Sequence, residues 1–365
     1  MMSTAQNRPN IVVLGSANVD ISARTALFPR DGETVTGEQV LVGTGGKGTN
    51  QATAASRAGA RVTMIAKLGC DFFADIPAKL YEREGFDTRY VTRTSEHGTG
   101  CALIEVLTTT GENRITVVPG ANMALTREDV YAAETEIAEA AVLLTQRETH
   151  PDSIAAFLEL GKKYGKPVIV NPAPALPIPA EWYPMIDTIT PNETEAEKYT
   201  GITVTDEKTA LDAACVFALW GVRRVIITRG RHGVFCAEFD ADKKPVFKAN
   251  IATMRVNAVD TTGAGDSFNG ALCTALGEGR TLVDACRFAT VAASLSVTRA
   301  GAAESMATRE EIDALYNKFY HSGIKIDARA RMLANENDIF WRALEGTGED
   351  GMITESDIRR AMKDN

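Results

Sequence analysis

The stretch Asn257–Gly270 (NAVDTTGAGDSFNG) joins a loop of small residues to one acidic side chain. A loop with so few side chains leaves the backbone N–H groups of Gly263, Ala264 and Gly265 free to point at a ligand. The helix predicted to follow adds its positive amino-terminal end, so the loop is a candidate anion site. Asp266 would repel a resting phosphate, but a carboxylate that accepts a hydroxyl proton beside a held phosphoryl group suits phosphoryl transfer to an alcohol. The alternative is an Asp that only caps a helix.

Asn18 and Asp20 form a second polar pair, directly after the apolar run Ile11–Gly15. That run predicts a buried parallel strand, and open α/β sheets bind ligands just beyond the carboxyl ends of such strands. An amide and a carboxylate together can donate to and accept from vicinal hydroxyls. The alternative is a polar loop with an Asx turn.

A glycine-rich segment, Gly43–Gln51 (GTGGKGTNQ), precedes a predicted helix. Its glycines satisfy G-x-G-x-x-G, but the strand before them has one wet face and does not suit a dinucleotide fold. It is no Walker loop either, because Leu41 stands where glycine is needed. We interpret the segment as a hydroxyl-binding wall, in which the backbone approaches a ligand and Lys47 and Asn50 supply donors. A tight helix-entry turn is the alternative.

Further polar residues follow other predicted strands. They are Glu148, the N-x-x-E pair of Asn192 and Glu195, and the turn glycines Gly230 and Gly233. Each alone is more often an ordinary surface loop, but their recurrence at one end of a parallel sheet favours a ligand crevice there.

The elements that must position these residues alternate between strand and helix. This rhythm predicts a parallel sheet covered on both faces, with right-handed crossovers. The strands are predicted at Ile11–Gly15, Val62–Ala66, Ala141–Thr145, Pro167–Val170, Ile186–Thr190 and Val225–Thr228, and the helices at Phe72–Glu84, Asp152–Tyr164, Glu193–Thr200, Asp206–Leu219, Leu282–Val297 and Thr308–Tyr320. Mixed polar and apolar segments predict a small antiparallel appendage at Glu33–Val42, Thr99–Leu107 and Asn113–Val118.

Composition limits the function classes. The 365 residues, 44% hydrophobic and 24% charged, suit one large globular α/β domain or two modest ones. A net charge of −9 argues against nucleic acid or an anionic membrane as the main partner. The six dispersed cysteines predict reduced thiols and a cytoplasmic location, and the four histidines lack metal-ligand spacing. Neither a secretory signal nor an apolar run long enough to span a membrane is evident.

The chain from about residue 10 to 320 resembles the PfkB family of carbohydrate kinases, and most closely its ribokinase members. The motifs are GSANVD, GGKGTNQA, NPAPALP, TPNETEAEKYTG, AVDTTGAGDSFNGAL and VTRAGA. The resemblance implies the ribokinase-like three-layer α/β/α sandwich, with a mainly parallel central sheet and a small β-sheet lid at about 33–43 and 98–119. It implies ATP-dependent phosphorylation of the 5-hydroxyl of D-ribose, with Mg²⁺ and with K⁺ as activator. A related kinase of 2-deoxyribose, fructose or a nucleoside is the alternative, and a non-catalytic sugar or nucleotide sensor is a different class.

The resemblance also assigns residue roles. Asp266 is the catalytic base and Gly263, Ala264 and Gly265 form the anion hole; Asn18, Asp20, Gly46, Lys47, Gly48, Asn50, Glu148 and Asp266 surround the sugar; Asn192, Thr228, Arg229, Gly230, Gly233, Gly265 and Thr290 bind the nucleotide; Glu195 holds Mg²⁺ through water; and Asp260, Thr262, Ser296, Arg299, Gly301 and Ser305 form a K⁺ site. Thr290 departs from the His or Asn often found near the adenine. The apolar residues on both faces of Thr34–Val42 and Cys101–Leu107 predict a homodimer through the lid.

Residues 321–365 have no counterpart in the family pattern and are predicted to form a helical extension. Within them, Gly346–Asp357 is spaced like an EF-hand loop between helices at Arg329–Leu344 and Glu355–Met362. Its first and third ligand positions are Gly346 and Gly348, which offer no side-chain oxygen, and Asp357 replaces the usual bidentate Glu. We therefore expect a helical hairpin that packs on the kinase domain or a partner, and not a calcium switch.

Overall fold

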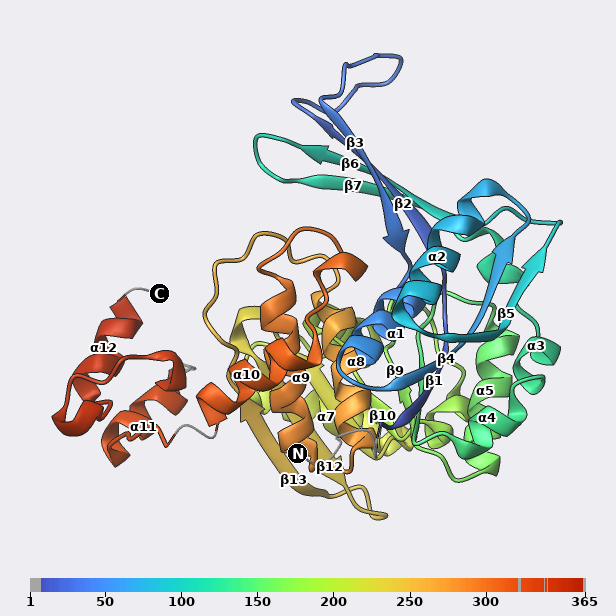
Figure 1. The fold of residues 1–365 in the computed structure, drawn as a ribbon. Helices are drawn as coiled ribbons and strands as arrows, with labels where there is room; N and C mark the ends of the chain where they lie inside the picture. The colour runs from blue at the N-terminus through green and yellow to red at the C-terminus, as the bar shows by residue number, and fades with distance from the viewer. Residues whose placement is uncertain (1–7, 321–322, 338, 340, 364–365) are drawn as a thin grey trace, which may run out of the picture.

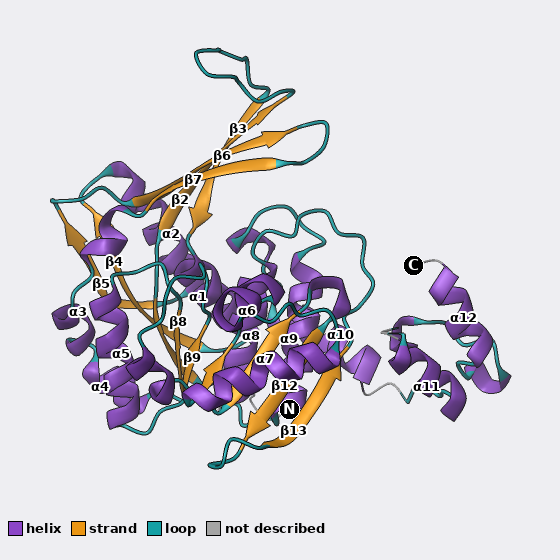
Figure 2. Ribbon diagram, turned by 180° about the vertical axis from the view of Figure 1, so that it is seen from behind, coloured by secondary structure: helices purple, strands orange, loops and turns teal. Residues whose placement is uncertain are grey.

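The computed structural model describes residues 8–320, 323–337, 339 and 341–363, and in them a nine-stranded sheet forms the centre (Figures 1 and 2). The strand order is β13-β12-β11-β10-β9-β8-β1-β4-β5. The strands from β11 to β5 are parallel, whereas β12 pairs antiparallel with both β11 and the edge strand β13. The strands are β1 Asn10–Leu14, β4 Arg61–Gly69, β5 Asp87–Thr94, β8 Val142–Thr145, β9 Val168–Val170, β10 Thr188–Ile189, β11 Arg224–Thr228, β12 Val234–Phe239 and β13 Pro245–Ile251.

Helices cover both faces of this sheet, and each layer has its own hydrophobic core. One face carries α1 Lys47–Arg57, α2 Asp75–Glu84, α8 Ala264–Gly277, α9 Leu282–Ser296 and α10 Arg309–Tyr320, and the other carries α3 Arg127–Tyr131, α4 Glu134–Glu139, α5 Pro151–Lys163, α6 Glu193–Thr200 and α7 Glu207–Trp220. Strand β1 shows how the sequence produces this arrangement. Ile11 and Val13 belong to one core, whereas Val12 and Leu14 belong to the other, because successive side chains point to opposite faces. The predicted three-layer fold is confirmed.

A second, four-stranded sheet projects from the body as a lid (Figure 1). Its order is β3-β2-β6-β7, formed by β2 Asn18–Thr25, β3 Gln39–Gly45, β6 Gly100–Leu107 and β7 Asn113–Val118. Two sequence expectations need correction here. Asn18 and Asp20 lie on the strand β2 and not on a loop, and the strand predicted from residue 33 begins only at Gln39. The sequence of β2 (NVDISART) mixes polar and apolar residues because one of its faces is directed to a polar site, so it lacks the apolar run of a core strand.

None of the described helices is both long and apolar enough to cross a membrane. The six cysteines form no disulfide with one another, and Cys236, Cys273 and Cys286 are buried in the core, as small hydrophobic residues often are.

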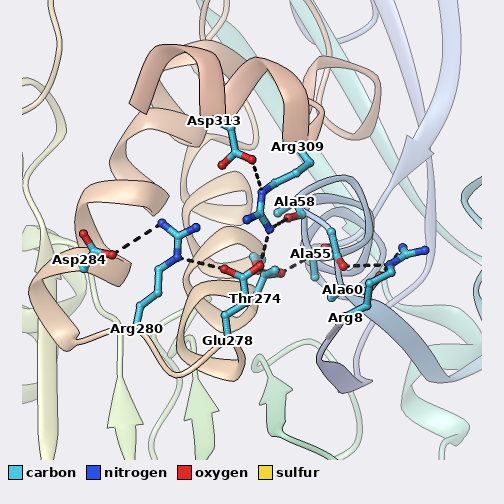
Figure 3. A network of polar contacts seen from close by, with 12 residues as sticks. Arg8, Ala55, Ala58, Ala60, Thr274, Glu278, Arg280, Asp284, Arg309 and Asp313 are labelled. Atoms are coloured by element: carbon cyan, nitrogen blue, oxygen red, sulfur yellow. Dashed lines mark hydrogen bonds and ion pairs between the residues drawn. The ribbon is translucent and has the colours of Figure 1, made fainter. Parts of the chain in front are cut away.

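Glu278 is the centre of an ion network that ties α8 to α1 and α10 (Figure 3). Its carboxylate accepts from Arg280, at 3.0 Å, and from Arg309. Arg309 also donates to the carbonyl of Ala58, 3.1 Å away, while Arg8 donates to that of Ala60, 2.8 Å away. These arginines satisfy carbonyl groups at the end of α1 that have no partner within the helix. The network therefore fixes α1 and α8 relative to each other at their carboxyl-terminal ends.

Replacing Glu278 by Gln should lower the free energy of unfolding by about 1–2 kcal/mol, since two guanidinium groups lose a charged acceptor. Thermal unfolding monitored by circular dichroism measures this change. Glu310→Gln is a matched control, because Glu310 is exposed and makes no ion pair with any described residue. Equal melting temperatures for the Glu278 and Glu310 variants would contradict the role of the network.

The extension folds around a small core of its own, beside the end of α10 (Figure 1). It contains α11 Ala328–Glu336 and α12 Glu355–Lys363, and Ile326 pairs with Ile353 in a parallel bridge between them. The first predicted helix is shorter than expected, since it ends at Glu336 and not at 344. Hydrogen bonds of 2.9 Å connect the extension to the body: Arg342 of the extension donates to the Phe319 carbonyl, and Arg255 of the body donates to the Ala361 carbonyl.

Asp357, the last residue of the EF-hand-like loop, holds that loop closed through hydrogen bonds. Its buried carboxylate accepts from the backbone N–H groups of Thr347, at 3.0 Å, and Thr354, at 2.9 Å, and from both threonine hydroxyls. Burial raises the pKa of Asp357, but these hydrogen bonds lower it by a larger amount, so the net pKa lies below the ordinary value. The carboxylate closes the loop by itself.

We expect Asp357→Asn to unfold the extension, because losing the charge weakens hydrogen bonds worth about 2–3 kcal/mol to a small module with little stability to spare. The contribution is present above the unfolded-state pKa of about 3.9 and is lost as the pH falls below it.

Deleting residues 325–365 should change stability or assembly yet leave the KM values for sugar and ATP within about twofold. Calorimetry should detect no Ca²⁺ binding to the full chain. Stoichiometric, micromolar Ca²⁺ binding that disappears on the deletion would contradict this.

Candidate functional site

Asp266 lies in the first turn of α8, behind the loop of small residues. Gly263 caps this helix with a φ of +75°, a left-handed conformation that glycine adopts readily. The carboxylate is 6% exposed, and its two oxygens accept from Gln51 Nε2 at 2.9 Å and Asn50 Nδ2 at 3.0 Å. Both amides belong to α1, so the close packing of α1 against α8 builds this pair of contacts. Gly270 makes the packing possible, since a Cβ there would lie 2.4 Å from the Gln51 carbonyl oxygen.

The Lys47 ammonium group interacts electrostatically with three carboxylates of the site, those of Asp266, Glu148 and Glu195. Burial lowers its pKa, but Asp266, Glu148 and Glu195 raise it, and the net pKa lies above the ordinary value. For Asp266 the opposite balance holds. Burial raises its pKa more than Lys47, Gln51 and Asn50 lower it. The site thus holds a carboxylate that accepts a proton readily, beside a permanent ammonium charge.

Glu148 anchors the start of α1 to the end of β1. Its Oε2 accepts from the Lys47 backbone N–H at 3.0 Å and from the Ser16 hydroxyl at 2.6 Å. Gly46 and Gly48 allow this approach, because a Cβ on Gly46 would lie 2.9 Å from the Asn18 nitrogen and one on Gly48 would lie 2.4 Å from the chain at residues 15–16. The predicted sugar wall is therefore a backbone surface closed by a carboxylate.

Asn18 and Asp20 share one face of the lid strand β2. Each has a glycine beside it on a neighbouring strand. A Cβ on Gly100 would lie 2.2 Å from Asn18 Oδ1, and one on Gly45 would lie 1.9 Å from Asp20 Oδ1. Burial, then the charges of Glu148, Glu304 and Asp266, raise the pKa of Asp20 to about 6. These clearances leave room for both polar side chains on the lid face that is predicted to meet the sugar.

Asn50 has an unpaired acceptor. Its Nδ2 is committed to Asp266, whereas its buried Oδ1 has no hydrogen-bond partner among the described residues. A buried polar atom without a partner is costly, so the atom is suited to a ligand donor such as a sugar hydroxyl.

The predicted nucleotide side lies at the ends of β10 and β11. Asn192 and Glu195 form a capping box for α6, with N–O distances of 2.9 and 2.8 Å, and Asn192 pairs with Thr228 in a parallel bridge. One oxygen of Glu195 is therefore used in capping. Burial raises the pKa of Glu195 although Lys47 and others lower it, which places its carboxylate in the same field as Asp266. Gly230 and Gly233 have φ values of +50° and +82° and shape the following turn.

Two predicted nucleotide residues make their contacts outside the group around Asp266. The buried Arg229 side chain lies 3.4 Å from the Thr205 carbonyl oxygen and 4.0 Å from Glu193. Thr290 is buried in α9, where its hydroxyl donates to the Cys286 carbonyl of the same helix at 2.8 Å. Neither side chain hydrogen-bonds to the group around Asp266 in the described part of the chain.

Asp260 joins the anion loop to the loop after α9. Its Oδ1 accepts from the Thr262 N–H at 2.9 Å and its Oδ2 from the Gly301 N–H at 3.0 Å. Burial raises the pKa of Asp260, but these bonds and the charge of the lid residue Arg24 lower it to below the ordinary value.

The other predicted K⁺ residues lie in or next to the two loops that Asp260 joins. The hydroxyls of Ser296 and Ser305 donate to the backbone carbonyls three residues earlier, at 2.9 and 2.8 Å, which leaves their oxygen lone pairs available. Arg299 pairs with Glu311, so only its carbonyl could face an ion. One carboxylate among neutral oxygens suits a monovalent cation better than a divalent one.

Similarity to known proteins identifies the family to which the chain belongs. The family model "pfkB family carbohydrate kinase" matches residues 8–309. The chain belongs to the pfkB family of carbohydrate kinases. A ribokinase from Haemophilus influenzae is 41% identical over 304 residues, covering 83% of this chain and 97% of that protein. A deoxyribokinase from Salmonella typhi is 33% identical, covering 83% and 97%. The structure of Arabidopsis thaliana ribokinase complexed with ribose and ATP matches with a TM-score of 0.76 at 33% identity, covering 85% of this chain and 99% of that one.

The pfkB resemblance identified from the motifs is thereby confirmed, whereas the individual residue roles stay predictions. The structure brings Asp266, Lys47, Asn50, Glu148 and Asp20 together from distant parts of the chain. Sequence reasoning missed Ser16, Gln51, Asn122, Gln146 and Asn171, which hold the predicted residues in place. Gln51 and Asn171 lie inside the motifs GGKGTNQA and NPAPALP, so their polarity within otherwise apolar or glycine-rich stretches was the available signal.

Proposed function

We propose that this pfkB-family chain is a ribose kinase that transfers the γ-phosphoryl group of ATP to the 5-hydroxyl of D-ribose. The observation that carries the proposal is the buried carboxylate of Asp266, held by two amides at the head of a helix whose entry loop is the predicted anion site. Similarity to the Haemophilus influenzae ribokinase and to the Arabidopsis thaliana ribokinase complexed with ribose and ATP supports these substrates.

Each residue has a definite part in this mechanism. Asn18 and Asp20 on the lid, with the free Oδ1 of Asn50, hold sugar hydroxyls. Asp266 accepts the proton of the 5-hydroxyl as that oxygen attacks the γ-phosphorus, which typically contributes about 10²–10⁴-fold in rate. The N–H groups of Gly263, Ala264 and Gly265 stabilise the charge on the transferring group, usually the larger electrostatic effect. Closure of the lid over the sugar would exclude water and suppress ATP hydrolysis.

Mg²⁺ would enter with ATP. The described residues contain no group of three or more Asp, Glu, His or Cys side chains that could hold a metal, so a dedicated protein site does not fit. A single carboxylate does fit a water-mediated contact, and Glu195 has one oxygen outside its capping box. Mg²⁺ would neutralise phosphate charge. Free thiols throughout the chain support a cytoplasmic enzyme.

ATP consumption with a panel of D-ribose, 2-deoxyribose, fructose and adenosine tests the function. We expect D-ribose to give the highest kcat/KM and the product to carry phosphate on the 5-oxygen. Similarity to the Salmonella typhi deoxyribokinase favours 2-deoxyribose as the second candidate, which the same panel distinguishes. Sugar binding without turnover on any member of the panel would identify the non-catalytic sensor and contradict the proposal.

The lid carries more exposed apolar surface than a covering layer needs. Val40, Val42, Leu103 and Val118 are 48–65% exposed, and the strand register places them on the face opposite Asn18 and Asp20. Ile115 and Val117, 56% and 50% exposed, lie on the other face. Because contiguous apolar patches of this kind mark interaction surfaces, we propose that two lids pack together in a homodimer.

A dimer through the lid should dissociate when a charge enters the patch. We expect Val42→Lys to be monomeric at micromolar concentrations at which the wild type is dimeric, because the lysine would be buried without a partner. Sedimentation velocity measures the change. The control is Val246→Lys, since Val246 is 61% exposed on β13, outside the lid. A wild type that sediments strictly as a monomer would contradict the proposal.

A further inference from the structure

Behind Asp266 lies a chain of buried amides that no predicted role includes. Gln51 Nε2 uses both of its hydrogens, one toward Asp266 Oδ1 at 2.9 Å and one toward Asn171 Oδ1 at 3.0 Å. Its Oε1 accepts from Gln146 Nε2 at 2.8 Å. The three amide side chains are 0%, 1% and 7% exposed for Gln51, Gln146 and Asn171. They come from α1 and from the ends of β8 and β9, so the core of the sheet fixes their positions.

The direction of these hydrogen bonds is also fixed. Asn171 Nδ2 donates to the backbone carbonyl of Thr190 at 3.1 Å, and a carbonyl can only accept. The Asn171 oxygen must therefore face Gln51, which forces the Gln51 nitrogen toward both Asn171 and Asp266. If the Gln51 amide turned over, its oxygen would meet two acceptors, Asn171 Oδ1 and Asp266 Oδ1. Only one orientation satisfies the group, and it directs an N–H at the carboxylate.

This N–H acts on a carboxylate whose charge is opposed by its surroundings. Burial raises the pKa of Asp266, and Lys47, Gln51 and Asn50 lower it, while Glu148 raises it again. Asp20 and Glu195 also lie within electrostatic range of Asp266, and each would disfavour a second negative charge. The hydrogen bonds to Asp266 that the structure contains come from Gln51 and Asn50. Because both favour the ionised form, losing either makes the carboxylate easier to protonate.

We propose that Gln51, oriented by Gln146 and Asn171, is a positioning residue that keeps Asp266 ionised and aimed at the substrate hydroxyl. The inference rests on the proposed function, in which Asp266 is the general base. Gln51 need not touch the sugar or ATP. Its effect on the reaction passes through the carboxylate it holds.

The decisive variant is Gln51→Met, which keeps the length of the side chain and removes the donor. We expect kcat to fall about 10- to 100-fold with KM values for sugar and ATP changed less than about threefold. The acid limb of the kcat–pH profile should move up by about one pH unit, since a hydrogen bond to the charged form is lost. Gln146→Met, which removes only the partner that orients Gln51, should shift the limb in the same direction by less. That variant also tests the proposal if the Gln51 variant fails to fold.

Thr53→Val is the matched control. Thr53 is buried in the same helix, but its hydroxyl donates to the Thr49 carbonyl one turn earlier, 2.8 Å away, and not toward Asp266. It should leave the pH profile unchanged. A wild-type pH profile in both glutamine variants, with Asp266→Asn inactive, would overturn this inference and leave the proposed function intact. Full activity of Asp266→Asn would overturn the base assignment itself.

Discussion

Replacing Asp266 by Asn should abolish most turnover, lowering kcat by about 10²–10⁴-fold, while the protein still binds sugar and ATP. The amide cannot accept the hydroxyl proton, and Asp266 is the acidic residue that the first turn of α8 contains. Burial already disfavours the ionised Asp266, so a neutral side chain of the same shape removes an electrostatic cost. Stopped assays of ATP consumption measure the loss, and calorimetry measures sugar binding.

The pH dependence of the wild type belongs to the same prediction. A base must be deprotonated to act, and the pKa of Asp266 is raised, so kcat should fall with decreasing pH at values above the ordinary Asp pKa of about 3.9. The same chemical change at the exposed Asp240, in the turn after β12, is the control and should leave kcat unchanged. Wild-type kcat in purified Asp266→Asn would remove Asp266 from the role of general base.

The fold was predictable where burial on both faces leaves a simple signature. β1, β8 and β11 are continuous apolar runs, and the structure places them in the parallel sheet within a residue or two of the expected ranges. The sequence did not reveal β5 or β13, because both lie at the sheet edges and neither is a buried apolar run: DTRYVTRT is mostly polar, and PVFKANI is mostly exposed and interrupted by Lys248 and Asn250. The helices α3 and α4 are only one to two turns long, too short for a periodic pattern.

The site divides in a similar way. Asp266, Lys47 and Asn50 were predictable because small residues around them leave a polar side chain conspicuous in the sequence. The N-x-x-E pair also has the spacing of a capping box, and the structure contains that box. Gln146 was not predictable, and the polarity of Asn171 within its motif did not indicate its partner, since their contacts with Gln51 span 95 and 120 residues of chain. Long-range polar contacts have no local periodicity that a single sequence can display.

Activity should rise strongly, by about tenfold, when K⁺ replaces a bulky organic cation at constant ionic strength. The reason lies in the two loops that Asp260 joins. The Thr262 N–H that Asp260 holds is one residue from Gly263, so a cation bound among the oxygens of these loops would set the geometry of the anion hole. The proposed coupling is therefore to transition-state stabilisation, and it should appear in kcat more than in the KM for sugar.

The variant Asp260→Asn tests whether the activation by K⁺ depends on the Asp260 carboxylate. Because the pKa of Asp260 is lowered, the carboxylate is ionised at neutral pH and supplies the one negative charge among the predicted K⁺ ligands. Without that charge the variant should respond little to K⁺ and should resemble the wild type assayed in the organic cation. Asp242→Asn, at an exposed position between β12 and β13, should keep the full response. Titrating K⁺ from zero to physiological concentration measures the activation. A wild type whose activity does not change over that range would rule out the site, because its anion hole would then have the active geometry without a bound cation.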